Sequence, residues 1–131
     1  MNAEELKKRT KKFSLRVLKL LGALPTNVQG RAIGSQLMRS GTSVGANYRA
    51  ACRGRSRREF IAKIGVVEEE ADESAFWMEL IIEGEMVKER LVSPLLKEAQ
   101  ELVAIMARSR KSATKSLRRS TNRQSAIGNR Q

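Results

Sequence analysis

Two carboxylates on one predicted helix have the spacing that acid–base chemistry would need. Glu70 and Glu73 lie three residues apart, close to Trp77, so all three share one side of a helix. A general acid and base would also need perturbed pKa values and a cleft around them. We favour another role, in which the two carboxylates pair with arginines such as Arg49, or with a neighbouring subunit, and fix packing.

A cluster of arginines indicates a second kind of chemistry, the binding of phosphate groups. The stretch RGRSRREF, residues 53–60, holds four arginines at the expected start of a helix. Ser56 is a suitable N-cap there, and Glu59 occupies the reciprocal position of a capping box. Cations in a first turn oppose the helix dipole by roughly 0.3–1 kcal/mol each, so helix stability does not explain them. The alternative is a solvated turn that only keeps the protein soluble.

The sequence lacks the residues that several other kinds of site require. The chain has no histidine, the commonest general base and a common metal ligand, and it has one cysteine, Cys52. No glycine-rich phosphate loop of the nucleotide-binding types occurs. We therefore predict that the protein is not an enzyme and holds no metal or cofactor.

Four glycines in the segment that ends near Cys52 share one side of a predicted helix. At 100° per residue, Gly30, Gly34, Gly41 and Gly45 fall within about 60° of one another. The alternative is that RSGTSVG forms a loop, but loop glycines need not keep this phase. A stripe of small residues lets another helix approach closely, from the same bundle or from a second subunit. Beside it Arg31, Arg39 and Arg49 form a basic ridge that continues into residues 53–58.

These observations define two sets of candidate residues. The residues predicted to bind nucleic acid are Arg31, Arg39, Arg49, Arg53, Arg55, Arg57 and Arg58. The residues predicted to form an oligomer interface or a close-packing surface are Gly30, Gly34, Gly41, Gly45, Glu70, Glu73 and Trp77.

Apolar residues at helical spacing predict four helices that position these side chains. The first covers about residues 3–23; the second follows a capping box at Thr26 and Gln29. The third begins after Ser56 and presents residues including Phe60, Trp77 and Leu80 on its apolar side, and Ser93 with Pro94 begins the fourth. We predict an all-α, antiparallel up-down four-helix bundle over residues 1–110. Residues 111–131 form a basic tail rich in Ser and Arg, which we expect to be frayed or disordered.

Charge is unevenly distributed along the 131 residues, whose net charge is +12. Residues 1–58 and 108–131 carry +12 and +8, whereas residues 59–107 carry −8. Such segregation predicts an anionic partner and complementary surfaces for self-association. The single cysteine and the absence of a long apolar run predict a cytoplasmic protein with no membrane segment.

The phrases LMRSGTSVGANYRAACRGRSRREFIAKIG and EEEADESAFWMELI resemble the bacterial four-helix-bundle family of intervening-sequence proteins, whose founding members are encoded in insertions within large-subunit ribosomal RNA genes. The resemblance covers roughly residues 10–110. It implies a ring-shaped homopentamer without enzymatic activity. It also implies a relation to the accessory proteins of diversity-generating retroelements, which are basic pentamers that bind a reverse transcriptase and nucleic acid.

Two functions from different classes follow as expectations. The first is an oligomeric scaffold that binds RNA, or DNA, through its arginines. Few aromatic residues accompany the arginines, which favours phosphate contact with little sequence specificity over base stacking. The second is a ring that docks an acidic protein partner such as a reverse transcriptase, with nucleic acid incidental.

Overall fold

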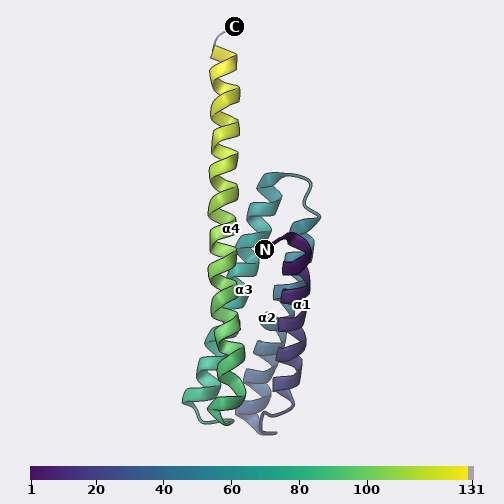
Figure 1. Ribbon diagram of the computed structural model, residues 1–131. Coiled ribbons are helices and arrows are strands. Elements are labelled where there is room, and N and C mark those ends of the chain that lie inside the picture. Colours follow the sequence, from purple (N-terminus) through teal and green to yellow (C-terminus); the bar gives the residue numbers. More distant parts are fainter. Residues whose placement is uncertain (130–131) are drawn as a thin grey trace.

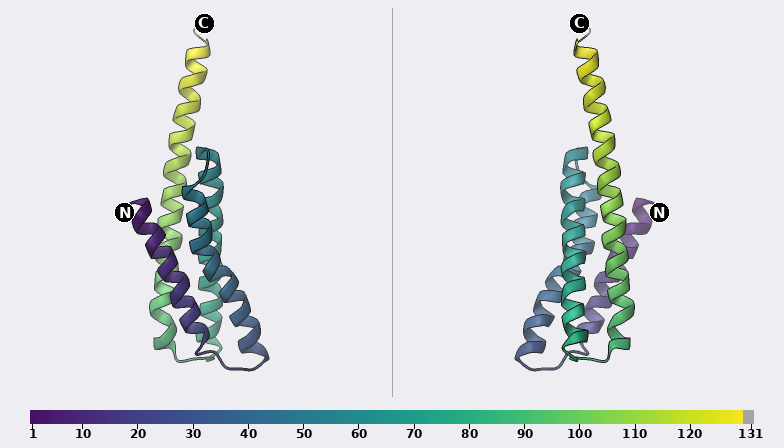
Figure 2. Two further views of the ribbon diagram at one scale, coloured as in Figure 1. Left: turned by 90° about the vertical axis from the view of Figure 1, so that its right-hand side faces the viewer. Right: turned by 90° about the vertical axis from the view of Figure 1, so that its left-hand side faces the viewer.

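The chain folds into an antiparallel up-down four-helix bundle, as predicted. The structure, a computed structural model, describes the backbone of residues 1–129 and the side chains of residues 1–125. Within that part, α1 spans Ala3–Leu21, α2 Val28–Cys52, α3 Arg57–Glu83 and α4 Glu89–Asn129. The α1–α2 and α3–α4 connections lie at one end of the bundle and the α2–α3 connection at the other (Figures 1 and 2).

Side-chain caps set where two of the helices begin. The Ser56 hydroxyl accepts a hydrogen bond from the Glu59 backbone N–H at 3.1 Å, so Ser56 is the N-cap of α3 as predicted. The N-cap of α2 is Asn27 and not Thr26, because the Asn27 side-chain oxygen accepts from the Gly30 N–H at 2.7 Å. Asparagine is at least as good an N-cap as threonine, which the capping-box pattern alone does not reveal.

All four glycines of the stripe lie inside α2, as predicted, and the alternative of a loop at RSGTSVG is excluded. Their open side faces α1 and the α1–α2 connection of the same chain. A Cβ on Gly41 would lie 2.8 Å from both γ-carbons of Val17, and one on Gly45 would lie 3.2 Å from the Thr10 carbonyl oxygen. The missing side chains therefore let α1 and α2 approach each other closely within one bundle.

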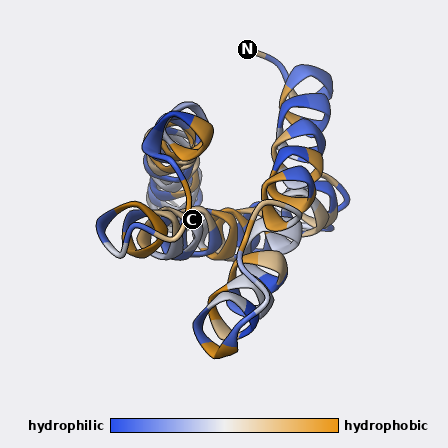
Figure 3. Cartoon of the chain, turned by 90° about the horizontal axis from the view of Figure 1, so that it is seen from below, coloured by the Kyte–Doolittle hydropathy of each residue, from blue (hydrophilic) through white to orange (hydrophobic). Residues whose placement is uncertain are grey.

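The core lies between the helices, each of which carries both hydrophobic and hydrophilic residues (Figure 3). Phe13, Leu37, Ile64 and Met106 are among its fully buried side chains. The full set of buried hydrophobic residues is Leu6, Phe13, Val17, Leu20, Leu37, Val44, Tyr48, Ala51, Ile64, Val67, Ala71, Ala75, Met78, Ile81, Val92, Leu95, Ala99, Leu102 and Met106.

Three side chains on the predicted apolar side of α3 lie less deeply than expected. Leu80 is 38% exposed, and Phe60 and Trp77 are half-buried. The fully buried side chains of this part of α3 are Ser74, Met78 and Ile81, and the Ser74 hydroxyl donates to the Ser40 hydroxyl at 2.9 Å. Phe60 and Trp77 pack against the edge of this core.

Helix α4 begins at Glu89, one turn before the predicted start at Ser93 and Pro94. The Ser93 hydroxyl donates to the Glu89 carbonyl at 3.0 Å instead of capping the helix. The earlier start places Val92 in the core, where it is fully buried. Burial of this side chain offsets the hydrogen bond that Pro94 cannot donate.

The basic tail continues α4 as a helix to Asn129, which differs from the frayed or disordered tail that we predicted (Figure 1). Residues 111–127 contain no proline or glycine, so local propensity permits a helix. Two contacts with α3 also hold this part of the chain: Arg110 pairs with Glu68 at 2.8 Å, and the Arg57 guanidinium donates to the Ser116 hydroxyl. The last two residues of the predicted tail, 130 and 131, lie outside the described residues. None of the helices within residues 1–129 combines the length and apolar character that a bilayer crossing requires.

Candidate nucleic-acid interface

The seven arginines predicted to bind nucleic acid all lie on the surface, but the structure does not bring them together. Arg53, Arg55, Arg57 and Arg58 are exposed around the α2–α3 connection. The other three are Arg31, Arg39 and Arg49, which follow α2 from its first turn to its last. Arg31 lies at the opposite end of the bundle, where its guanidinium donates to the Thr26 carbonyl at 3.2 Å.

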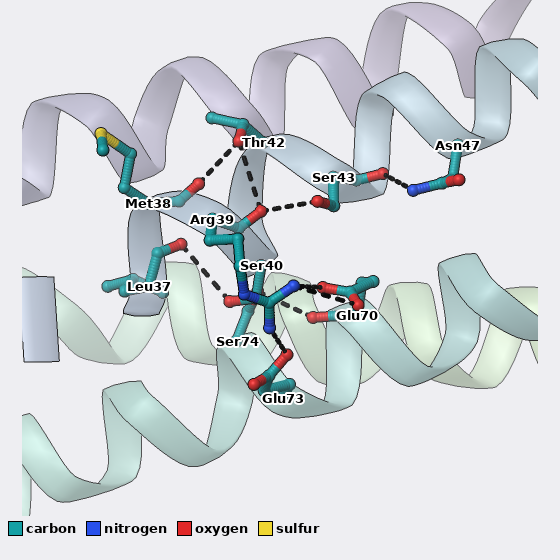
Figure 4. Close-up of polar contacts among 10 residues, drawn as sticks. All are labelled: Leu37, Met38, Arg39, Ser40, Thr42, Ser43, Asn47, Glu70, Glu73 and Ser74. Atoms are coloured by element: carbon teal, nitrogen blue, oxygen red, sulfur yellow. Dashed lines mark hydrogen bonds and ion pairs between the residues drawn. The ribbon is translucent and has the colours of Figure 1, made fainter. Parts of the chain in front are cut away.

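Arg39 is engaged by the two carboxylates that we considered for acid–base chemistry (Figure 4). Its guanidinium bonds to Glu73 and lies 3.2 Å from a carboxylate oxygen of Glu70. The hydrogen bond with Glu73 and the nearby Glu70 charge raise the pKa of Arg39. The two carboxylates therefore pair with Arg39 and not with Arg49, and they join α3 to α2 within one chain.

The arginines around the α2–α3 connection are held by the ends of both helices. The Arg53 N–H donates to the carbonyls of Ala50 and Ala51 at the C-terminus of α2. The Arg55 N–H donates to the Glu59 carboxylate at 2.6 Å. Their backbones are thus fixed while their guanidiniums face solvent, an arrangement suited to reaching an anion.

Two further arginines belong with this group, and the sequence reasoning missed them. A hollow of about 410 Å³ between the start of α3 and the extension of α4 is lined by Arg57, Ser116, Arg119, Ser120, Arg123 and Gln124. No carboxylate lines it. The spacing of these residues in the sequence could have indicated the hollow, because residues 116, 119, 120 and 123 share one face if the tail is helical. We call Arg53, Arg55, Arg57, Arg58, Arg119 and Arg123 the arginine rim.

A larger hollow adjoins the arginine rim. It measures about 690 Å³ and is lined by Arg57, Phe60, Ser109, Ser112, Ala113, Ser116, Leu117 and Ser120. Serine hydroxyls are its main polar groups and Phe60 its one aromatic ring. Such a surface offers hydrogen bonds to phosphate or sugar oxygens more readily than stacking to bases.

A separate basic groove lies between α1 and α2. It measures about 470 Å³ and is lined by Lys7, Lys8, Lys11, Ser14, Thr42, Gly45, Ala46 and Arg49. Lys7 pairs with Glu4 at 3.0 Å, whereas no ion pair within the described residues involves Lys8, Lys11 or Arg49. Arg49 thus belongs to this groove and not to the arginine rim.

Ion pairs also join α1 to α4. The Arg9 guanidinium donates to both carboxylate oxygens of Glu98, at 2.7 and 2.8 Å, and to Glu101 at 2.8 Å. The hydrogen bonds from Arg9 hold the pKa of Glu98 below its ordinary value. Among the residues that the structure describes, no group of three or more His, Cys, Asp or Glu side chains has the arrangement of a metal site.

The family model of the 23S rRNA-intervening sequence proteins matches residues 4–108, which span α1 to α3 almost completely, the α2–α3 connection and the first half of α4. The chain belongs to this family. The family match ends within α4, so residues 109–131, with Arg119 and Arg123, lie beyond it.

A solved structure supports the same assignment. The chain is similar to a protein of unknown function from the S23 ribosomal protein family of Bacteroides thetaiotaomicron, with 29% sequence identity and a TM-score of 0.75. The similarity covers 81% of this chain and 98% of the other. No curated protein matches the chain.

Proposed function

We propose that this intervening-sequence protein is a non-enzymatic, oligomeric scaffold that binds nucleic acid, with RNA as the first candidate, through the arginine rim. The observation that supports this most strongly is the meeting of two sequence-distant basic segments, around Arg57 and around Arg119. The chain carries no acidic residue after Glu101, so the extension of α4 has no carboxylate of its own to neutralise it.

The rim supports contact with phosphates rather than with bases. Guanidiniums bind phosphate oxygens in a bidentate manner and carry no base information when they do so. The hydroxyls of Ser116 and Ser120 beside them add neutral donors for sugar or phosphate oxygens. Binding should therefore depend strongly on salt and weakly on sequence.

The oligomer in this proposal is a homopentamer, as the family resemblance implies. A ring would place five arginine rims at one end of the assembly, because the rim lies at one end of each bundle (Figure 1). Contacts of modest strength would then add up through avidity on one nucleic acid. Light scattering at micromolar concentration and moderate salt tests this part, and a monomer would contradict it.

The competing function is docking of an acidic protein such as a reverse transcriptase, for which the rim also has the right charge. A competition experiment distinguishes the two. Labelled structured RNA is bound to the protein and displaced by unlabelled RNA or by poly-glutamate at equal concentration of negative charge. We expect RNA to compete at least tenfold better, because guanidiniums and hydroxyls match phosphate and sugar geometry. Equal competition would mean that the rim reads charge density alone and would favour the acidic protein.

A further inference from the structure

The outer face of α3 combines unpaired acids with exposed apolar side chains. Phe76 and Leu80 are 50% and 38% exposed. Glu69 and Asp72 precede them on the same helix face, and no ion pair within the described residues involves either. The ring of Trp77 meets that of Phe76 edge-on, with 5.1 Å between centroids, which holds Phe76 in place. Glu79 and Glu83 extend this stripe. We call these residues the α3 outer face.

A second surface, across α1 and α2, has the complementary composition. It contains the basic groove with Lys8, Lys11 and Arg49. Leu15 and Leu18 follow Lys8 and Lys11 on the same face of α1, since the four residues are spaced by three or four. Leu15, Leu18 and the neighbouring Met38 of α2 are 57%, 46% and 47% exposed. We call the groove and these three residues the α1–α2 face.

We infer that the α1–α2 face of one copy binds the α3 outer face of the next copy, which makes a heterologous contact able to close into a ring. This inference rests on the oligomer in the proposed function and names the surfaces that build it. Lysines and Arg49 on one side meet Glu69 and Asp72 on the other. Phe76 and Leu80 cover the apolar part, as aromatic anchors do in stable interfaces.

The two faces also agree in direction and height. Helices α1 and α3 run the same way in an up-down bundle, and on both faces the charged turn precedes the apolar turn. Gly41 packs on Val17, and Ser40 bonds to Ser74, so these residues mark one level of the bundle.

At a rise of 1.5 Å per residue from that level, Lys11 and Glu69 lie within roughly 3 Å of the same height, and so do Leu18 and Phe76. Rotation about an axis parallel to the bundle preserves heights. It therefore brings unlike charges together at one level and apolar side chains together at another.

A second copy explains these surfaces better than nucleic acid in the groove does. Phosphates would pair with the lysines, but they would leave Leu15, Leu18 and Met38 in water and give the acids of the α3 outer face no partner.

Disulfide crosslinking tests the contact directly. In a Cys52→Ser background, which removes the one native thiol, Leu18→Cys is combined with Phe76→Cys and the protein is oxidised. We expect a ladder of covalent oligomers on a non-reducing gel. The matched control combines Phe76→Cys with Leu91→Cys, since Leu91 is 49% exposed but belongs to neither face, and it should give at most a trace of crosslinked protein.

Charge-reversal variants test the same contact independently. Lys11→Glu and Glu69→Lys should each raise the concentration of half-dissociation about tenfold or more, and the double variant should restore the wild-type mass. Lys88→Glu, which changes the net charge equally at the other end of the bundle, should leave the mass unchanged.

Each failure has its own meaning. An oligomeric wild type without the Leu18–Phe76 crosslink overturns the interface but not the ring. A monomeric wild type overturns both and leaves nucleic-acid binding to be measured by itself. If Lys11→Glu weakens RNA binding while the mass is unchanged, the groove binds phosphates and the interface is wrong.

Discussion

At the scale of single residues, glycines determine how closely α1 and α2 pack. We predict that Gly41→Ala destabilises the fold by about 1–2 kcal/mol. The new Cβ would lie 2.8 Å from both γ-carbons of Val17, and this overpacking outweighs the roughly 1 kcal/mol that alanine gains in a helix. Gly65→Ala is the matched control, because its Cβ would meet nothing closer than 4.0 Å, and it should stabilise by about 0.5–1 kcal/mol. Urea denaturation measures both, and equal effects would contradict the close packing.

The ion pair between Arg9 and Glu98 should make the stability of the fold depend on pH. Because the pKa of Glu98 is lower in the folded than in the unfolded chain, the bond stabilises fully above the ordinary glutamate value of about 4.3. This stability is lost as the pH falls through the lower folded pKa. Glu98→Gln should therefore cost roughly 1–2 kcal/mol at pH 7 and progressively less as the pH falls below the ordinary glutamate value. A constant difference across that range in chemical denaturation would contradict the prediction.

At the scale of helices, apolar periodicity predicted the four helices and the bundle that they form. It also placed Leu80 on the buried side of α3, where Met78 and Ile81 are the fully buried side chains and Leu80 is 38% exposed. The paired carboxylates were predicted correctly as ion-pairing residues, but choosing Arg39 over Arg49 needed the offset between two helices. Arg119 and Arg123 were missed because a polar segment without apolar periodicity offered no core face from which to expect a helix.

We predict that the extension of α4 is helical but adds little to the stability of the bundle. Ser120→Pro should remove helical signal at 222 nm in circular dichroism without lowering the melting temperature of the bundle. Proline costs about 3 kcal/mol in a helix interior, and the extension beyond Leu117 buries little. Ser120→Ala should keep the signal. If proline changes neither the signal nor the melting curve, the extension is not helical in solution.

At the scale of the whole molecule, the strongly charged surfaces lie apart from one another. The arginine rim lies at one end, while the basic groove and the acidic α3 outer face lie along the sides of the bundle. The proposed ring, built through the sides, would leave the rims free and parallel, so assembly and nucleic-acid binding would use different residues. Salt should then affect the two differently: exposed ion pairs contribute little to an interface that apolar contact dominates, whereas phosphate contacts weaken steeply.

The salt dependence of RNA binding tests whether nucleic acid binds to the arginine rim. The variant with Arg53, Arg55, Arg57 and Arg58 all changed to Gln is compared with one in which Lys19, Arg31, Lys88 and Arg90, at the opposite end, are changed to Gln. We predict weaker binding of every sequence by the rim variant, and a slope of log affinity against log salt flatter by up to roughly 0.7–0.9 per lost phosphate contact. The control variant should keep the wild-type slope. Equal slopes for the wild type and the rim variant, with both proteins folded, would contradict nucleic-acid binding through the arginine rim.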